Sequence, residues 1–304
     1  MSIRIVIIGS GGRLGAALTR ELAGKFDVVG FNHAQLDLTD AEQIHAKIDN
    51  LEFDVLINAA AFTNVDLCEK ERGQAFQINA EAPRSLAEIA REKEAKLIHF
   101  STDYVFDGKK REPYLESDPA NPISVYGESK RKGEENVLAV QDRHLVVRVS
   151  WVFGPDRPSF VDAIIKRARE SGHVDALADK FATPTYTLDI AQMLSQFFGD
   201  WSRRAPAPDG PWAGRLQGIL HFANAGECSW QEYAQHAVDC CHKFGLPLKA
   251  KTIAPLKLAD MKNFVARRPV YSVLSTVKFT SFTASPPRSW RDAVAEYVRD
   301  HVRE

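Results

Sequence analysis

Tyr126 and Lys130 lie four residues apart in the stretch VYGESK, near the middle of this 304-residue chain. At that spacing on a helix both side chains lie on one face and point into the same space. A phenol with a pKa of about 10 is a poor acid at neutral pH, but a nearby ammonium stabilises the phenolate and lowers that pKa. The pair therefore predicts a proton donor whose acidity the lysine adjusts.

Two hydroxyl side chains, Ser101 and Thr102, begin the stretch STDYVFDG at the end of a strand expected over residues 96–100. The carboxyl edge of a parallel sheet is where such folds bind their ligands. Hydroxyls at this edge could hydrogen-bond a carbonyl oxygen beside the tyrosine. The alternative interpretation is that they cap the strand end, with Asp103 making a local turn.

The glycine-rich stretch GSGGRLG directly follows the first apolar run and contains Gly9, Gly12 and Gly15. Glycines are needed where a strand turns sharply, where backbone approaches a pyrophosphate and where a helix packs closely on a strand. The N-terminus of the helix that follows then presents free N–H groups to the phosphates. The position of this loop favours dinucleotide binding, and a simple tight turn is the alternative.

The end of the second expected strand, GFNHAQ, bears on which dinucleotide binds. An acidic residue there would bind the ribose 2′-hydroxyl of NAD, but Asn32 is the first polar residue. Arg13 in the glycine loop could instead pair with a 2′-phosphate, although it could equally be a solvated surface arginine. The sequence thus favours NADPH, with NADH possible.

Two further stretches are expected beside the cofactor. Asp37 and Leu38 lie where the adenine ring would be, and small residues follow the third strand in NAAAFT, residues 58–63. Small side chains let the backbone approach a ligand, while Asn58 could cap or close a turn.

In the first half of the chain, apolar runs alternate with helical patterns. These elements would position the residues described above. The expected strands are Ile3–Ile8, Asp27–Phe31, Asp54–Asn58, Lys96–Phe100 and Leu145–Val149. Five such strands predict an α/β fold with a Rossmann-like, doubly wound parallel sheet over residues 1–150. Thr39 and Ser124 are expected to begin helices, the second of which carries Tyr126.

Residues 151–304 are expected to form mainly a smaller mixed α/β domain for the substrate, with segments that could return to the sheet. Helical patterns cover about 158–170 and 187–199, and a Pro-rich stretch at 203–211 reads as an exposed loop. Ser229 and Glu232 have the spacing of a capping box.

Composition excludes several classes of protein. A net charge of −1 gives no general attraction to nucleic acid or to an anionic membrane. The apolar run near the N-terminus is too short to span a bilayer. The four cysteines, Cys68, Cys228, Cys240 and Cys241, lack the spacing of a zinc site or a disulfide scaffold. We therefore expect a soluble, cytoplasmic protein with reduced thiols.

Together these motifs resemble the dTDP-4-dehydrorhamnose reductase family of the extended short-chain dehydrogenase/reductase superfamily. The resemblance covers nearly the whole chain. It is carried by the glycine loop at 9–15, NAAAFTNVDLCE at 58–69, INAEAP at 78–83, STDYVFDG at 101–108, PISVYGESKRKGE at 122–134, RVSWVFG at 148–154, HFANAGECSWQEYA at 221–234 and ARRPVYSVLSTVKF at 266–279.

This resemblance implies an oxidoreductase of dTDP-rhamnose and polysaccharide biosynthesis. It would reduce the 4-keto group of the nucleotide sugar dTDP-6-deoxy-L-lyxo-4-hexulose with NADPH or NADH and yield dTDP-L-rhamnose. Tyr126 would be the proton donor, Lys130 would lower its pKa and hold the nicotinamide ribose, and Thr102 would tune the tyrosine.

The implied binding residues extend this site. Thr102, Asp103 and Trp151 would contact the sugar, although Trp151 could instead pack in the core between the domains. The cofactor would be bound by Gly9, Gly12, Arg13, Leu14, Gly15, Asn32, Asp37, Leu38, Ala59, Ala61, Phe62, Thr63, Tyr126 and Lys130.

The chain departs from the family pattern at three positions. Arg13 replaces a usual Gln, which bears on the choice of cofactor, and Tyr271 replaces a usual Asn, which bears on the choice of sugar. Ala17 lies where the family has acidic residues at a metal-linked dimer contact, so we expect no metal, and either a monomer or a homodimer.

Two other functions share much of this pattern. A related type of protein keeps the fold as a non-catalytic, NADP-binding regulatory subunit, but Thr102, Tyr126 and Lys130 are all present here. A nucleotide-sugar epimerase of the superfamily would use the same tyrosine and lysine, and would retain its cofactor through the cycle.

Overall fold

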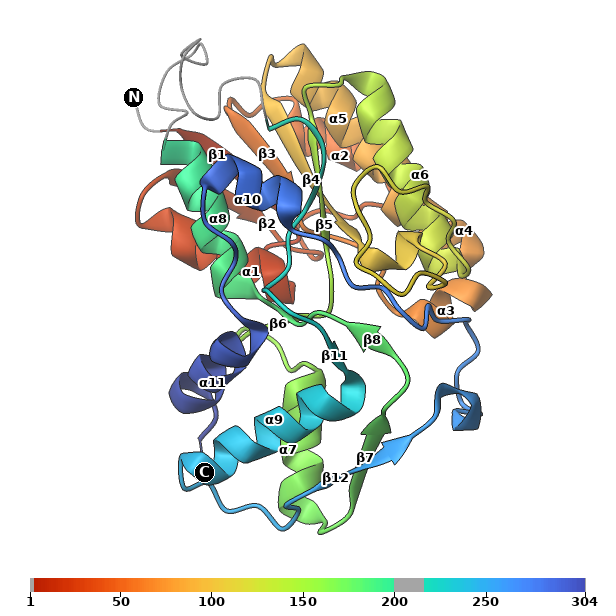
Figure 1. Ribbon diagram of the computed structural model, residues 1–304. Coiled ribbons are helices and arrows are strands. Elements are labelled where there is room, and N and C mark those ends of the chain that lie inside the picture. Colours follow the sequence, from red (N-terminus) through yellow and green to blue (C-terminus); the bar gives the residue numbers. More distant parts are fainter. Residues whose placement is uncertain (1–2, 200–215, 304) are drawn as a thin grey trace.

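A computed structural model describes residues 3–199 and 216–303 of the chain, and its centre is a six-stranded parallel sheet (Figure 1). The strands run in the order β10-β5-β4-β3-β1-β2, and every neighbouring pair is parallel. Their bounds are β1 Arg4–Ile8, β2 Asp27–Phe31, β3 Val55–Asn58, β4 Lys96–Thr102, β5 Leu145–Val149 and β10 Gly218–His221. The chain adds β2 on one side of β1 and β3 on the other, so the topology switches beside β1.

Helices cover both faces of the sheet, as an α/β fold with near-continuous apolar strands requires. On one face lie α1 (Arg13–Ala23), α8 (Thr187–Gly199) and α10 (Val277–Thr283). The other face carries α2 (Ala41–Ile48), α5 (Ala82–Glu92) and α6 (Val125–Val140). Ile5 and Ile7 of β1 pack toward the first group, and Val6 and Ile8 toward the second.

Short helical segments fill the connections at the carboxyl edge of the sheet. They are α3 (Val65–Lys70), α4 (Arg72–Phe76), the π-helical turn η1 (Gln77–Glu81) and the 3₁₀ turn η2 (Asp103–Val105).

A second, smaller lobe lies below the sheet in Figure 1. It contains α7 (Phe160–Glu170), α9 (Trp230–Lys243), α11 (Trp290–His301) and η3 (Leu258–Asp260). Its strands pair as β7 (Val174–Leu177) with β12 (Ile253–Leu256), β8 (Phe181–Ala182) with β11 (Cys228–Ser229), and β6 (Val152–Phe153) with β9 (Thr185–Tyr186). Three segments after residue 150, namely α8, β10 and α10, belong to the sheet layer instead.

Most of the expected elements are confirmed, with small changes at their ends. All five expected strands form, and β4 continues two residues further, to Thr102. The prediction that Thr39 caps α2 is wrong, because the side chain of Asp40 accepts the hydrogen bond from the backbone N–H of Gln43. Ser124 caps α6, and Ser229 with Glu232 forms the capping box of α9. The Pro-rich stretch 203–211 lies outside the described residues.

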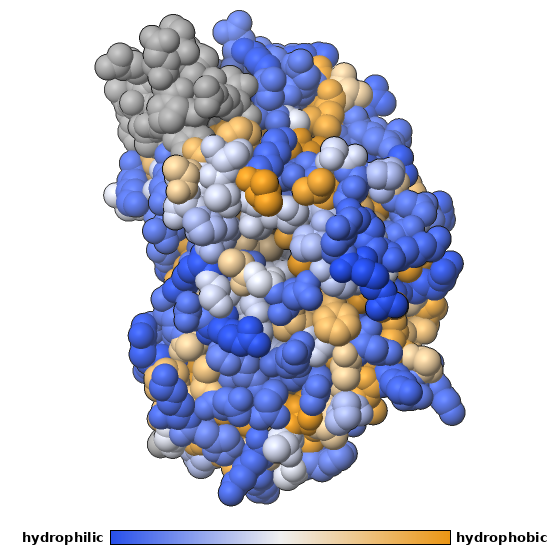
Figure 2. Space-filling model, viewed as in Figure 1, coloured by the Kyte–Doolittle hydropathy of each residue, from blue (hydrophilic) through white to orange (hydrophobic). Residues whose placement is uncertain are grey.

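The surface and the cysteines agree with the composition. Figure 2 shows a mainly hydrophilic face with small, scattered apolar groups. Within the two described ranges no helix combines the length and apolarity that a membrane span needs. In the same residues no cluster of three His, Cys, Asp or Glu side chains is arranged to hold a metal. The four cysteines are buried free thiols.

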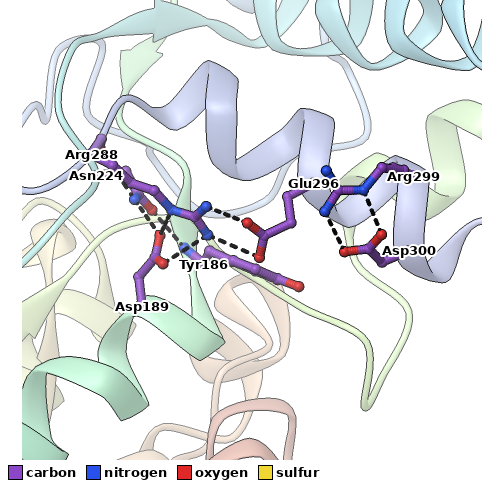
Figure 3. Close-up of polar contacts among 7 residues, drawn as sticks. All are labelled: Tyr186, Asp189, Asn224, Arg288, Glu296, Arg299 and Asp300. Carbon is purple, nitrogen blue, oxygen red and sulfur yellow. Dashed lines mark hydrogen bonds and ion pairs between the residues drawn. The ribbon is translucent and has the colours of Figure 1, made fainter.

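A polar network centred on Arg288 holds α11 against the start of α8 (Figure 3). Its guanidinium contacts both carboxylate oxygens of Asp189, at 2.9 and 2.8 Å, and Oε2 of Glu296 at 2.5 Å. Asn224 extends the network, since its amide donates to Asp189 and accepts from the backbone N–H of Tyr186. Burial opposes the charge on Arg288, but bonds to the two carboxylates outweigh it and raise its pKa.

Replacing Arg288 should therefore destabilise the protein. Arg288→Met leaves Asp189 and Glu296 without their shared cation, and we expect a loss of about 2 kcal/mol in the free energy of unfolding, measured by urea denaturation. Arg299→Met is the matched control, because Arg299, within α11, forms an ion pair with its exposed neighbour Asp300 and with no other carboxylate among the described residues. Equal midpoints for the two variants would contradict the role given to Arg288.

Candidate active site

A cavity of about 1190 Å³ runs along the carboxyl edge of the sheet and continues to the second lobe. The structure brings all but one of the predicted site residues to its wall. Those on the wall are Gly9, Gly12, Arg13, Leu14, Asn32, Asp37, Leu38, Ala59, Ala61, Phe62, Thr63, Thr102, Asp103, Tyr126, Lys130 and Trp151. The exception is Gly15, which lies behind the wall, in α1.

The glycine loop has no space for side chains at two points. Gly9 has φ +86°, and a Cβ there would lie 2.7 Å from the backbone nitrogen of Ala60. At Gly15 a Cβ would lie 2.0 Å from the carbonyl oxygen of Gly9, so only glycine lets α1 begin so close to β1. Gly12 caps α1, and the N-terminus of this helix opens at the cavity wall. The loop is therefore a cradle suited to phosphates.

Side chains at the end of β2 shape the far end of the cavity. The side-chain oxygen of Asn32 accepts hydrogen bonds from the backbone of Ala34 and Gln35. Asp37 accepts from the backbone N–H and the hydroxyl of Thr39, which lowers the pKa of its carboxyl. Both residues therefore hold turns in the wall.

Arg13 has protein partners that the sequence does not reveal. Its guanidinium donates to the carbonyl oxygens of Val152, Arg157 and Pro158, and burial lowers its pKa. Arg157 in turn donates to the carbonyl oxygen of Gly11 at 2.9 Å. The two arginines thus tie the glycine loop to the chain entering the second lobe. Arg13 is not the solvated surface residue of the alternative interpretation, and its pairing with a 2′-phosphate remains a prediction.

Helix α6 holds Tyr126 and Lys130 on one face, and several contacts fix its start. The hydroxyl of Ser124 accepts from the N–H of Gly127, and a carboxylate oxygen of Glu69 accepts from the N–H of Val125 at 2.9 Å. Further along, the side chain of Asn79 joins Ser129 to the loop after β3 through the backbone of Phe62. Helix and cofactor loop are therefore held as one unit.

Lys130 is fully buried, and a chain of hydrogen bonds defines its surroundings. Its Nζ donates to the carbonyl oxygen of Phe100 at 2.7 Å and lies 3.4 Å from Nε2 of His99. The Oδ1 of Asn58 accepts from the N–H of Ala60, so its Nδ2 must donate to Nδ1 of His99, 3.1 Å away. The ring proton of neutral His99 then lies on Nε2 and faces Lys130, which disfavours the ammonium.

Burial also disfavours the charged form of Lys130, as the ring proton of His99 does. It lowers the pKa of Lys130 to about 8, although the carboxylate of Glu134 opposes the change. Burial, with Lys130 nearby, also holds the pKa of His99 well below its ordinary value, so His99 is neutral at physiological pH. Lys130 therefore changes its charge close to neutral pH. Sequence reasoning considered Asn58 only as a turn residue and missed His99.

Tyr126 is almost fully buried, with its ring edge-on to Tyr104 at 5.6 Å between centroids. Burial raises its pKa, and only hydrogen bonding to Thr102 opposes this significantly. The lowering of this pKa by Lys130 remains a prediction, and the amine of Lys130 donates to the carbonyl oxygen of Phe100. A phenol that stays protonated at neutral pH is nevertheless the form that a proton donor needs.

The hydroxyl and carboxyl groups after β4 have different partners. Ser101 is buried with no hydrogen-bond partner for its hydroxyl among the described residues, and it lines the cavity. Thr102 caps η2 by accepting from the N–H of Tyr104, so the alternative capping role is real. Asp103 accepts from the hydroxyls of Thr102, Ser150 and Ser272, at 3.1, 3.0 and 2.6 Å. Its substrate contact remains a prediction.

Trp151 packs in the second lobe and also lines the cavity, and its contact with the sugar remains a prediction. It lines the cavity and packs on the rings of Phe160, Trp230 and Tyr233 in the second lobe, at 4.9–5.2 Å between centroids. Its backbone has φ +48°, an unfavourable conformation for a residue with a side chain. The turn after β5 therefore aims the indole at the cavity at a cost in backbone strain.

The structure adds residues at the substrate end that sequence reasoning missed. Lys180 and Trp230 line the cavity, and Lys180 is almost fully buried. The sequence signal that could have pointed to Lys180 is a charged residue directly before the short strand β8. Tyr271 is outside the wall and donates to Glu227 at 2.6 Å, while Ala17 is fully buried in α1.

Comparisons with known proteins agree with this geometry. The family model described as the RmlD substrate binding domain matches residues 3–303. A dTDP-4-dehydrorhamnose reductase of Mycolicibacterium smegmatis is 36% identical over 301 residues, covering 98% of this chain and 86% of that protein. The spore coat polysaccharide biosynthesis protein SpsK of Bacillus subtilis is 32% identical over 299 residues, covering 98% and 97%.

Solved structures show the same likeness. A dTDP-4-dehydrorhamnose reductase of Bacillus anthracis, crystallised with NADP, superposes with a TM-score of 0.86 at 29% identity, covering 98% of this chain and 99% of that one. The family model and the relatives both match along almost the whole chain. The chain therefore belongs to the dTDP-4-dehydrorhamnose reductase family.

Proposed function

We propose that this protein uses NADPH to reduce the 4-keto group of dTDP-6-deoxy-L-lyxo-4-hexulose to dTDP-L-rhamnose. The observation that carries the proposal is a single cavity whose wall holds both the glycine loop and the group Thr102, Tyr126 and Lys130. The names of the M. smegmatis and B. anthracis relatives support the sugar and the cofactor.

The residues at the sheet edge fit a dinucleotide. The glycine loop is a cradle that a single Cβ would fill, and α1 presents its N-terminus there. Ser101 adds a buried hydroxyl with no partner in the described protein. Gly12 and Leu14 would hold the phosphates, Asp37 and Leu38 the adenine side, and Ala61 the middle of the cofactor. When bound, the nicotinamide supplies a hydride.

Tyr126 then protonates the oxygen formed at C4 of the sugar. Its raised pKa keeps the proton on the phenol until that oxygen gains charge. Thr102 positions the same oxygen with its hydroxyl, and Lys130 holds the ribose and provides charge beside the phenol. Burial of these groups excludes water, so placing the two substrates in register contributes much of the rate.

One relative favours a second sugar. The probable dTDP-4,6-dihydroxy-2-methyloxan-3-one 4-ketoreductase of Streptomyces antibioticus is 35% identical over 300 residues and covers 98% of this chain. The same cavity would then act on a keto sugar with fewer hydroxyls. This candidate keeps the reaction and changes only the substrate.

The direct test is loss of reduced-cofactor absorbance with each keto sugar, using NADPH and then NADH. Tyr126→Phe should lower kcat by at least about 100-fold, because it removes the proton donor and keeps the ring. Tyr233→Phe is the matched control, since it removes a buried hydroxyl that has no hydrogen-bond partner in the described protein and should leave most of the activity.

The outcomes separate the competing functions. Tight NADPH binding without turnover of either sugar would reject the reductase and favour a regulatory subunit. Conversion of the sugar without net cofactor oxidation would indicate an epimerase.

The alkaline limb of the kcat–pH profile should report Lys130. Activity is expected to fall above about pH 8, where Lys130 loses its proton. His99→Leu removes the N–H that disfavours the ammonium, so the limb should move upward by about one pH unit. His144→Leu is the control, because His144 is also buried in the sheet but bonds to the backbone of Leu97 and Ala87. A limb that stays in place in His99→Leu would refute this assignment.

A further inference from the structure

Lys180 is a buried lysine whose ammonium has no hydrogen-bond acceptor among the described residues. Only 1% of its surface is exposed, yet it lines the large cavity. Its Nζ lies 5.3 Å from the ring centre of Tyr104 and 5.7 Å from that of Trp230. In the described part of the chain no acceptor or carboxylate is recorded within bonding distance of this ammonium. Its three N–H donors are therefore available to a ligand.

The backbone at Lys180 is tied to two neighbouring segments. The carbonyl oxygen of Lys180 accepts from the N–H of Trp230 at 3.3 Å, and the N–H of Phe181 donates to the carbonyl oxygen of Val270 at 2.7 Å. The pairing of β8 with β11 begins at the next residue. The side chain therefore starts from a hydrogen-bonded backbone, and its Nζ lies near the rings of Tyr104 and Trp230.

Holding a charge there is unfavourable in the protein alone. Burial lowers the pKa of Lys180 to about 8, the carboxylate of Asp103 opposes this, and the nearby Arg268 adds to it. Asp103 is no direct partner, because its oxygens accept from Thr102, Ser150 and Ser272. An anionic ligand at Nζ would relieve this cost.

The other cations on the described cavity wall are already engaged or lie elsewhere. Arg13 and Arg157 donate to backbone carbonyl oxygens at the glycine loop, and Lys130 donates to Phe100. His33 is at the end of β2. Lys180 is the basic side chain that remains at the end formed by Trp151 and Trp230.

Tyr126 and Lys180 suit the two ends of the hexose in a nucleotide sugar. In a pyranose the C4 keto carbon and the phosphate-bearing C1 are at opposite ends of the ring. Tyr104 neighbours both groups that would bind these ends, since its ring centre lies 5.6 Å from that of Tyr126 and 5.3 Å from Nζ of Lys180. A hexose with C4 at Tyr126 would direct its diphosphate toward the second lobe.

We propose that Lys180 binds a phosphoryl oxygen of the substrate's diphosphate and so orients the hexose with C4 toward Tyr126. The inference rests on the proposed function for the identity of the sugar nucleotide. It adds a residue that determines binding and orientation at the second-lobe end of the cavity.

Equilibrium binding of dTDP and of thymidine to the NADPH-loaded protein tests this directly, by calorimetry or tryptophan fluorescence. Lys180→Gln and Lys180→Met should weaken dTDP binding by at least about tenfold. Lys180→Arg keeps the charge and should stay close to wild type. Thymidine, which has no phosphate, should bind equally to all four proteins, and NADPH affinity should not change.

The pH dependence adds a readout that a purely structural role would not produce. Affinity for dTDP should fall above about pH 8 in wild type, as the ammonium loses its proton, and should stay level in Lys180→Arg. The charged or titratable groups that face Lys180 are Asp103, Arg268 and Tyr104. Burial raises the pKa of Tyr104 further above pH 8, and Arg268 is in an ion pair with Asp66. Burial also raises the pKa of Asp103, but titration of Asp103 would persist in Lys180→Arg, so a level profile in that variant assigns the change to Lys180.

The result that would overturn the proposal is unchanged dTDP affinity in Lys180→Gln and Lys180→Met. A raised KM for the keto sugar together with unchanged dTDP affinity would place the ammonium at the sugar and would equally reject it. Binding of dTDP does not require turnover, so failure of the proposed reaction leaves this test intact. Lys180→Met removes a buried charge and is therefore expected to fold.

Discussion

Hydrogen bonding to the buried carboxylate of Asp103 is the interaction on which the second-lobe end of the cavity depends. A carboxylate out of water is costly unless its oxygens accept hydrogen bonds, and here three hydroxyls from three segments supply them. Thr102 comes from β4, Ser150 from the end of β5, and Ser272 from a segment far along the chain. Loss of any one hydroxyl would make the buried charge of Asp103 less stable. The carboxylate therefore favours the arrangement in which all three segments stay together.

Several features of the site follow from that constraint. Ser150 directly precedes Trp151, so the bond to Asp103 sets where the strained turn begins and where the indole points. Thr102 is held by both Asp103 and Tyr104, which leaves its hydroxyl at the cavity wall beside Tyr126. The negative charge also opposes the lowering of the Lys180 pKa by burial, without bonding to that lysine. One buried group thus influences a threonine beside Tyr126, an aromatic wall and a buried lysine.

The parts of this site that the sequence could predict are those fixed by local geometry. Helical spacing is enough to put Tyr126 and Lys130 on one face, and Gly9 and Gly15 lie where no side chain would fit between β1 and α1. The strands β1, β3, β4 and β5 were predictable because they are buried on both faces and therefore read as continuous apolar runs. The edge strand β2 is only half-buried but keeps an apolar run. Thr102 was predictable from its place at a strand end, and the family resemblance added its role toward Tyr126 and added Trp151.

What could not be predicted depends on contacts between distant segments. The partners of Arg13 lie about 140 residues away, and nothing in the glycine loop indicates them. Nothing in the residues around Lys180 distinguishes it from a surface lysine, and it becomes buried when β8 pairs with β11. The proton on His99 is set by the amide of Asn58, whose own orientation depends on Ala60. The chain passes repeatedly between the sheet and the second lobe, since α8, β10 and α10 return to the sheet after the lobe has begun. The second lobe is therefore built from several separate stretches of the chain, so it cannot be exchanged between related proteins as one continuous segment.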